Sequence, residues 1–288
     1  MHETSSAPVH SSCQNCGTPL QGAYCHRCGQ KDVDFHRGLR HVLHEALEAW
    51  FHVDHSFLHG FYDLLFRPGR MTVDFNAGRR ARHVPPFRFY VVISLLFFFV
   101  FFRSSHDSVQ EVGGGKASVV IGGEQNLNDI QLDLGLSPER NLAIRKTLLE
   151  KAQHPERTLA EFAHAVPKAL LVCLPFLALL TRVAYWKKPY FYIQHLVYAI
   201  HLHSFVFLWW IVAFGWSSLV GLALPALSTW ANLAAFLYAV YYYYASMRRS
   251  FSASRGTAIA LGTLVGGAYF LLVATALLVT LLITLICL

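Results

Sequence analysis

Four cysteines near the N-terminus have the spacing of a metal site. Cys13 and Cys16 form one Cys-x-x-Cys pair, Cys25 and Cys28 form a second, and eight residues separate the two pairs. A glycine follows each pair and permits a tight turn in which two thiolates can meet one ion. Two such turns give a closed tetrahedral site of four sulfurs, which zinc favours in a structural role. We therefore predict a zinc ribbon over residues 13–30.

The alternatives for these cysteines are a disulfide pair and a redox dithiol. Disulfides are disfavoured in a reducing cytosol, and a redox motif needs only one Cys-x-x-Cys pair. Because a closed site leaves no coordination position for a substrate, we interpret the zinc as a structural cofactor. The remaining cysteines, Cys173 and Cys287, lie singly in apolar stretches and are interpreted as packing residues.

A second group of candidate residues lies within one apolar stretch and comprises Gln194, His195, His201 and His203. Polar groups inside a membrane are costly and usually face a bundle interior or a cavity. These residues are therefore candidates for an intramembrane site that binds metal, haem or protons. The alternative is interhelical hydrogen bonding that stabilises packing. On an ideal helix His201 points away from the other two imidazoles, so a shared site would need residues from other spans.

A third group is a polar stripe that includes His52, His55, His59 and Asp63. A helix over residues 39–66 would carry apolar residues on one face and this stripe on the other. Asp54 falls on the apolar side, which favours two helices with Asp54 capping the second. We interpret the two helices as amphipathic elements that lie on the membrane surface or against the bundle, with the polar stripe in water. The alternative is that the stripe forms a metal or proton site.

The elements that position these residues are predicted to be membrane-spanning helices. The chain is 54% hydrophobic and 14% charged, whereas soluble domains average roughly 25% charged residues. Stretches of about 20 apolar residues are long enough to cross a bilayer. Five such stretches occur, at about residues 86–102, 166–185, 191–216, 227–244 and 257–288. In the last one, Gly262 and Gly266 predict a close helix contact, within the chain or in a dimer.

The predicted fold class is therefore an all-α integral membrane bundle of about five transmembrane helices, with a small zinc ribbon and amphipathic juxtamembrane helices. The predicted organisation is a disordered tail over residues 1–12, the ribbon over 13–30, cytosolic or interfacial helices over 36–84, and the bundle over 86–288. Within the bundle, residues 103–165 are expected to form a loop-helix segment outside the membrane.

Basic residues predict the orientation of these spans. The link between the second and third spans carries Arg182, Lys187 and Lys188, and the link between the fourth and fifth carries Arg248, Arg249 and Arg255. The link between the third and fourth spans has no Lys or Arg. Short loops rich in Lys and Arg stay in the cytosol, so we expect the N-terminus inside and the C-terminus outside. The net charge of +7 is then explained by lipid contact, and nucleic-acid binding is not favoured.

Several motifs together resemble the bacterial membrane family named domain of unknown function 3667. The motifs are Cys-Gln-Asn-Cys-Gly-Thr (13–18), Tyr-Cys-His-Arg-Cys-Gly-Gln (24–30), Phe-His-Val-Asp-His-Ser-Phe-Leu (51–58), Arg-Pro-Gly (67–69), Gly-Arg-Arg (78–80) and His-Leu-Val-Tyr-Ala-Ile-His-Leu-His-Ser-Phe (195–205). The resemblance implies a bacterial inner-membrane protein with a zinc ribbon. It supplies no activity and no catalytic residue.

The sequence does not reveal a reaction, and we predict no catalytic residue. The leading hypothesis is a non-enzymatic scaffold or sensor whose ribbon and amphipathic helices engage a protein partner or the membrane surface. Its expected partners are the lipid bilayer and either another protein or a second copy of the chain. The alternative is a transporter or channel for ions, protons or small solutes that uses the histidines of the third span. A third hypothesis is a membrane metalloenzyme that combines those histidines with His52, His55 and His59.

Overall fold

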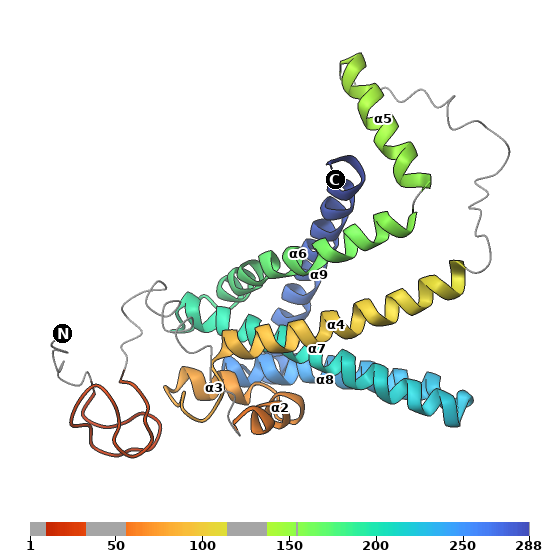
Figure 1. The fold of residues 1–288 in the computed structure, drawn as a ribbon. Helices are drawn as coiled ribbons and strands as arrows, with labels where there is room; N and C mark the ends of the chain where they lie inside the picture. The colour runs from red at the N-terminus through yellow and green to blue at the C-terminus, as the bar shows by residue number, and fades with distance from the viewer. Residues whose placement is uncertain (1–9, 33–55, 114–136, 154, 288) are drawn as a thin grey trace. The chain divides into compact units, whose positions relative to one another are not determined.

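The computed structural model describes residues 10–32, 56–113, 137–153 and 155–287. Every regular element in these ranges is a helix, which confirms the all-α prediction. The helices are α2 (Ser56–Phe66), α3 (Arg70–Asn76), α4 (Pro86–Gly113), α5 (Pro138–Gln153), α6 (Pro155–Ala184), α7 (Tyr192–Ala223), α8 (Pro225–Ser250) and α9 (Arg255–Cys287) (Figure 1).

The chain divides into two compact units. The first comprises Met1–Phe97 and Leu174–Ala268, and the second comprises Phe98–Cys173 and Tyr269–Leu288. Within the second unit, Lys151 of α5 forms an ion pair with Glu161 of α6. All the candidate metal, intramembrane and polar-stripe residues belong to the first unit.

Among the described residues, four helices are long and apolar enough to cross a membrane. The candidate spans are Pro86–Arg103, Arg157–Ala184, Tyr192–Gly221 and Arg255–Ile286, and they coincide with four of the five predicted stretches. The remaining predicted stretch, at about residues 227–244, forms most of α8. That helix has the necessary length, but four consecutive tyrosines and Asn232 lower its mean hydropathy.

Helices α7 and α8 form an antiparallel pair. Leu224 alone separates them. Deeper in the pair, Trp209 donates its indole N–H to the Ala235 carbonyl at 3.0 Å. Farther along, the Phe205 ring stacks on Tyr242 with ring centroids 3.4 Å apart. The chain therefore returns along α8 to the end of the unit where α7 began.

The links that carry the basic residues meet at this end of the unit. Lys188, between α6 and α7, donates to the Ser252 carbonyl between α8 and α9 at 3.1 Å. Arg249, at the end of α8, donates to the Pro68 carbonyl in the turn between α2 and α3 at 3.2 Å. The two links expected on the cytosolic side thus lie together, as a common side of the membrane requires.

Helices α2 and α3 pack against the bundle helices of the first unit. The Phe61 ring of α2 contacts Phe89 of α4 with centroids 5.2 Å apart. Gly69, in the turn between α2 and α3, has a positive φ of 72°, and a Cβ built on it would lie 2.8 Å from the Ser246 carbonyl of α8. Of the two placements predicted for the amphipathic segment, its described part adopts the one against the bundle.

The glycines of α9 pack within the chain. A Cβ built on Gly262 would lie 2.9 Å from the Tyr244 ring of α8, and one built on Gly266 would lie 3.2 Å from the Tyr243 hydroxyl. The same Tyr243 hydroxyl donates to the Gly262 carbonyl at 2.8 Å. The close helix contact predicted for this glycine pair is therefore made with α8.

Candidate functional site

Two identical turns build the cysteine site. In the first, the Gly17 amide donates to the Cys13 carbonyl at 2.8 Å, and in the second, the Gly29 amide donates to the Cys25 carbonyl at 2.8 Å. The two glycines have φ values of 75° and 71°, a left-handed conformation that side chains with a Cβ rarely adopt. The glycines are therefore required for each Cys-x-x-Cys segment to curl around a common centre.

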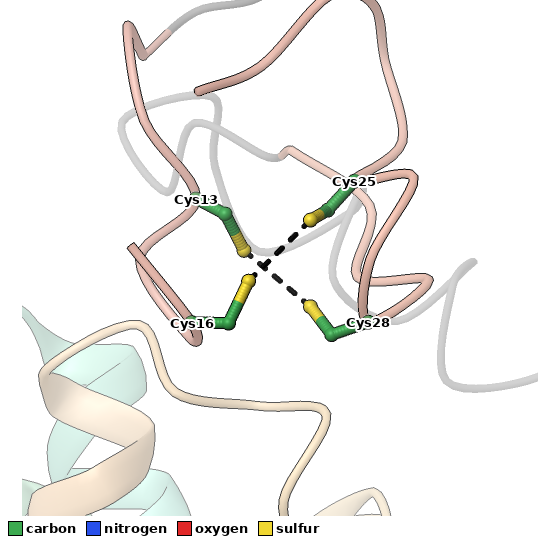
Figure 2. A group of neighbouring side chains, drawn as sticks. All are labelled: Cys13, Cys16, Cys25 and Cys28. Atoms are coloured by element: carbon green, nitrogen blue, oxygen red, sulfur yellow. Dashed lines mark hydrogen bonds between the residues drawn. The ribbon is translucent and has the colours of Figure 1, made fainter. Parts of the chain in front are cut away.

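The four sulfur atoms converge on one point (Figure 2). The Sγ atoms of Cys13 and Cys28 are 3.5 Å apart, as are those of Cys16 and Cys25. All four lie within 4.8 Å of one another. A disulfide would need about 2.05 Å, whereas a tetrahedral ion with bonds of about 2.3 Å to sulfur separates its ligands by roughly 3.8 Å. The four free thiols are thus placed to hold a metal ion, and they are not paired as disulfides.

The thiols of this site differ in acidity. Burial raises the pKa of the Cys13 thiol to about 11. Hydrogen bonding by the Thr18 hydroxyl, 3.3 Å away, lowers the pKa of Cys16 to about 6. The set therefore supplies a thiolate at neutral pH, and thiolates are the form that binds metal.

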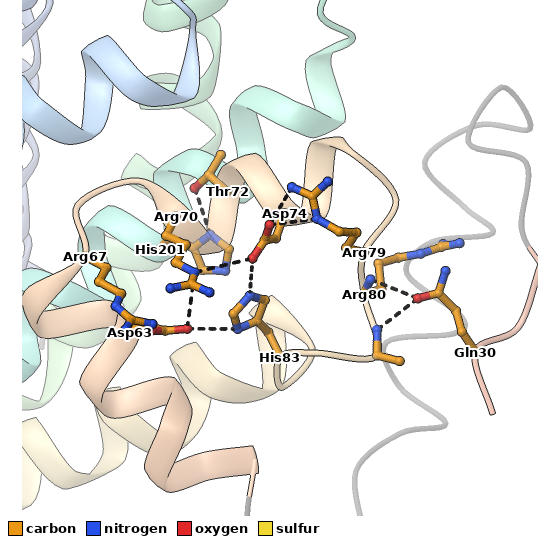
Figure 3. Close-up of polar contacts among 11 residues, drawn as sticks. Gln30, Asp63, Arg67, Arg70, Thr72, Asp74, Arg79, Arg80, His83 and His201 are labelled. Carbon is orange, nitrogen blue, oxygen red and sulfur yellow. Dashed lines mark hydrogen bonds and ion pairs between the residues drawn. The ribbon is translucent and has the colours of Figure 1, made fainter. Parts of the chain in front are cut away.

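The ribbon is attached to the loop after α3 by one buried side chain, Gln30 (Figure 3). Its amide nitrogen donates to the Gly78 carbonyl at 2.8 Å. Its amide oxygen accepts from the backbone N–H groups of Arg80 and Ala81, each at 3.0 Å. A carboxamide is both donor and acceptor, which this arrangement needs. Since Gln30 lies two residues after Cys28, the metal site and this contact share one turn.

The same loop leads to a buried carboxylate, Asp74. Arg79 donates to Asp74 from Nη2 at 2.6 Å and from Nε at 2.9 Å. His83 contacts the second carboxylate oxygen through Nε2 at 2.8 Å. Burial raises the pKa of Asp74, but the hydrogen bonds from His83 and Arg79 outweigh burial, so the net pKa lies below its usual value. The carboxylate is therefore charged and paired at neutral pH.

A second buried carboxylate, Asp63 of α2, joins this network. Arg67 donates to it at 2.8 Å, and Nδ1 of His83 lies 3.8 Å from it. The Nε atom of Arg70 lies 3.8 Å from both Asp63 and Asp74. Figure 3 shows His83 and Arg70 between the two carboxylates. Buried carboxylates are costly unless they are paired, and here three guanidinium groups and an imidazole surround them.

Helix α3, which carries Arg70 and Asp74 of this network, contacts α7 through Thr72 and His201. The Thr72 hydroxyl lies 2.9 Å from Nδ1 of His201, and the two residues are 1% and 6% exposed. The other ring nitrogen of His201, Nε2, is buried and has no hydrogen-bond partner among the described residues. His201 of the predicted intramembrane group thus contacts the α2–α3 segment.

The other two histidines of α7 have separate surroundings. His195 lies 3.1 Å from the Thr181 hydroxyl of α6 and stacks on Phe251 with ring centroids 4.9 Å apart. His203 contacts the Ala199 carbonyl of its own helix at 2.9 Å. The structure therefore does not bring the three imidazoles into one site.

Two further predicted groups are placed at the surface. The Gln194 side chain accepts from the Phe191 amide at 2.8 Å, where it satisfies the N-terminal end of α7. His59 is exposed on α2, whereas His52, His55 and Asp54 lie outside the described residues. The same stripe was predicted to include Asp63, which the structure instead places in the buried network.

The network of buried charges around Asp63 and Asp74 was not predicted from the sequence. Asp63, Arg67, Arg70 and Asp74 recur at spacings of four, three and four residues, the spacing of one helical face. That pattern continues across the Pro68–Gly69 turn, and it could have identified the four residues as one set. His83 carries no such local pattern.

Comparisons with known proteins give one match. No curated protein and no solved structure matches the chain. The model of the family described as "Protein of unknown function (DUF3667)" matches residues 54–98, the stretch that contains Asp63, Asp74 and His83, and it confirms over that stretch the resemblance drawn from the motifs.

Proposed function

We propose that the chain is a non-enzymatic membrane protein whose zinc ribbon is a cytosolic platform for a protein partner, held in a fixed position on the helix bundle. The observation that carries this proposal is the Gln30 contact, in which one buried amide makes three hydrogen bonds to the loop at residues 78–81. A ribbon on a free tether would turn independently of the membrane domain. A ribbon fixed in this way presents one face to a partner.

Zinc is the metal that best suits the four-cysteine site. Four thiolates in a closed tetrahedral arrangement are typical of structural zinc. The ribbon buries few apolar side chains apart from its cysteines, so metal binding would supply most of its folding free energy. We expect about one zinc ion per chain in the purified protein, measured by inductively coupled plasma mass spectrometry. Cys16→Ser should lose this zinc, whereas Cys173→Ser, which changes a thiol outside the ribbon, should retain it.

The proposed membrane arrangement has five crossings, with the N-terminus in the cytosol of a bacterium and the C-terminus outside. It is supported by the antiparallel α7–α8 pair, because a helix that returns along the full length of a membrane span must cross too. The basic links gathered at one end support the cytosolic assignment of that end. Alkaline phosphatase fused after Leu288 should be active, since this enzyme folds only outside the cytosol. An inactive phosphatase fusion, together with fluorescence from a green fluorescent protein fused at the same position, would place the C-terminus in the cytosol and contradict the arrangement.

Tyr24 is the side chain we propose as the contact point for the partner. It precedes Cys25 directly and is 61% exposed. Exposed tyrosines are typical anchors at protein interfaces, since they offer a rigid apolar ring and a hydroxyl. Tyr24 also lies outside the contact that Gln30 makes with the bundle loop, so the attached ribbon leaves it accessible.

The test is crosslinking in intact membranes followed by quantitative mass spectrometry of captured proteins. Cys13→Ser should abolish the specific crosslinks, because the ribbon loses its metal. Tyr24→Ala should abolish the specific crosslinks as well. This variant should still bind zinc, and the amides of the loop at residues 78–81 should still be protected from hydrogen exchange. Cys173→Ser is the matched control and should match the wild type. Equal capture by wild type, Cys13→Ser and Tyr24→Ala would remove the basis of the platform.

A transporter or channel is the second candidate, and the observation that favours it is His201, a buried imidazole whose Nδ1 contacts the Thr72 hydroxyl of α3 and whose Nε2 has no hydrogen-bond partner among the described residues. The separate placement of His195 and His203 weakens a shared path along α7. Flux of protons or ions into liposomes that His201→Ala reduces, and His59→Ala does not, would support transport. The metalloenzyme hypothesis needs a second metal site built from histidines. In the described ranges, the four cysteines are the only cluster of three or more His, Cys, Asp or Glu side chains that lies close enough to hold an ion.

A further inference from the structure

A pocket opens where α8 ends, beside the turn between α2 and α3. Its volume is about 440 Å³, which is within the range of small-molecule binding sites. The lining residues are Pro68, Tyr241, Ala245, Arg248, Arg249, Ser252 and Ala253. All of them belong to the first unit of the chain.

The pocket is positively charged. Arg248 and Arg249 line it, and no carboxylate does. The guanidinium of Arg249 donates to the Pro68 carbonyl, a neutral partner that orients the side chain, and none of the carboxylates in the described ranges pairs with it. The Arg248 guanidinium is exposed and makes no hydrogen bond or ion pair within the described part of the chain. Two uncompensated guanidinium groups on one wall favour an anion, and they match phosphate best because their donors form a planar fork.

Close backbone contacts hold the walls of the pocket in place. Gly69 packs so tightly on α8 that a Cβ there would lie 2.8 Å from the Ser246 carbonyl, which fixes the neighbouring Pro68. Another lining residue, Ser252, has a positive φ of 46°, and its carbonyl accepts from Lys188. The pocket is therefore formed before a ligand arrives, which lowers the entropic cost of binding.

The pocket lies at the end of a candidate membrane span. The apolar window of α9 begins at Arg255, three residues after Ser252. Tyr241 lines the pocket about two and a half helical turns before the end of α8, and it is 60% exposed. Tyrosines at this level typically contact the boundary between lipid headgroups and acyl chains. A phosphate in the pocket would then lie at the depth of the lipid phosphates.

We propose that this pocket binds the phosphate group of an anionic phospholipid, with Arg248 and Arg249 donating to the phosphate oxygens and Tyr241 packing against the glycerol and upper acyl chain. Basic pockets between membrane helices on the cytoplasmic side are suited to such headgroups. The site would fix the junction of α2, α3 and α8 to the lipid surface. It does not depend on a partner for the ribbon.

Native mass spectrometry of the full-length protein in detergent, with added lipid, tests this proposal. The probes are phosphatidylglycerol, zwitterionic phosphatidylcholine and inorganic phosphate. Wild type should retain phosphatidylglycerol in preference to phosphatidylcholine. Arg248→Gln together with Arg249→Gln should weaken phosphatidylglycerol binding about 30-fold, because each of the two cations contributes about 1 kcal/mol at the membrane surface. Arg248→Lys keeps the charge and should weaken it less.

Arg255→Gln is the matched control, because it removes the same charge at the same end of the unit from a residue that does not line the pocket. It should bind phosphatidylglycerol as the wild type does. Zinc content and far-ultraviolet circular dichroism report whether each variant is folded. Equal binding of the two lipids, or loss of phosphatidylglycerol in the Arg255 variant as large as in the double variant, would overturn the proposal. Saturation of the pocket by inorganic phosphate with no retained lipid would overturn the lipid assignment.

Discussion

Replacing Gln30 by alanine should release the ribbon from the bundle without removing its metal. The side chain makes three hydrogen bonds to the loop at residues 78–81 and is 8% exposed. It coordinates nothing in the cysteine cluster, so the four sulfurs keep their positions. The substitution therefore separates attachment of the ribbon from its folding.

The contacts set the size of the effect. A hydrogen bond inside a protein contributes about 1 kcal/mol net, so three contribute about 3 kcal/mol to attachment. That value corresponds to about a 100-fold change in the equilibrium between attached and released ribbon. Gln30→Glu should have a smaller effect. Its carboxylate can still accept from Arg80 and Ala81, but it cannot donate to the Gly78 carbonyl.

Hydrogen–deuterium exchange of the protein in lipid nanodiscs measures this equilibrium. The Ala81 amide is the best reporter, because it donates to the Gln30 oxygen, whereas the Arg80 amide also donates to the Gly78 carbonyl at 3.1 Å. Protection of Ala81 should fall by up to about 100-fold in Gln30→Ala. Gln21→Ala removes the same side chain from an exposed ribbon position and should exchange like the wild type.

Unchanged exchange at Ala81 in Gln30→Ala, with zinc still bound, would refute the reasoning. It would mean that the loop is ordered by the Arg79–Asp74 contact and that the ribbon contributes nothing to it. The platform proposal would then lose the observation that carries it.

Three further outcomes are expected from the α2–α3 segment. Gly69→Ala should lower the thermal unfolding midpoint by an amount equivalent to about 2 kcal/mol, because φ at Gly69 is 72° and the new Cβ would meet the Ser246 carbonyl. Gly256→Ala is the control: a Cβ there meets open space, so this change should not lower the midpoint. Thr72→Val should destabilise the protein by about 1–3 kcal/mol in chemical unfolding, since it leaves the buried Nδ1 of His201 without its partner. Thr275→Val is the control, because the Thr275 hydroxyl bonds a carbonyl of its own helix. Equal losses of stability in the two variants would contradict a role for the Thr72–His201 contact. Asp74→Asn should destabilise most near neutral pH, because the pKa of Asp74 is lowered in the folded state. The stabilising contribution of Asp74 is therefore present above the unfolded pKa of about 3.9 and is lost as pH falls through the folded pKa. A difference in stability between wild type and variant that does not shrink as the pH is lowered below the unfolded pKa would contradict the pairing.

The cysteine site could be predicted because its geometry is local. Two Cys-x-x-Cys pairs followed by Gly17 and Gly29 determine both turns within a few residues, and the structure brings the sulfurs together as expected. The attachment of the ribbon could not be predicted in the same way. Gln30 meets Gly78, which lies 48 residues later, and nothing in a single glutamine marks it as buried.

The buried network shows a second limit of sequence reasoning. Charged residues beside apolar spans usually face solvent or lipid headgroups, and the polar stripe that includes Asp63 is accordingly predicted to face solvent. The Pro68–Gly69 turn instead folds α2 and α3 onto α7 and α8, and burial then requires the charges to pair. That tertiary packing has no counterpart in residue type or periodicity. The separation of His201 from His195 and His203, by contrast, followed from helical geometry alone.

The single-residue link at Leu224 has a consequence for how the chain enters a bilayer. With 32 residues, α7 is about 48 Å long, which exceeds the hydrocarbon thickness of about 30 Å. Alone, α8 would expose its tyrosine hydroxyls and Asn232 to lipid at a high free-energy cost. Joined directly to α7, it can insert together with its neighbour as one hairpin, and the hydrophobicity of the first limb then carries the second limb across. A longer polar linker at Leu224 would uncouple the two steps and leave α8 stranded at the surface.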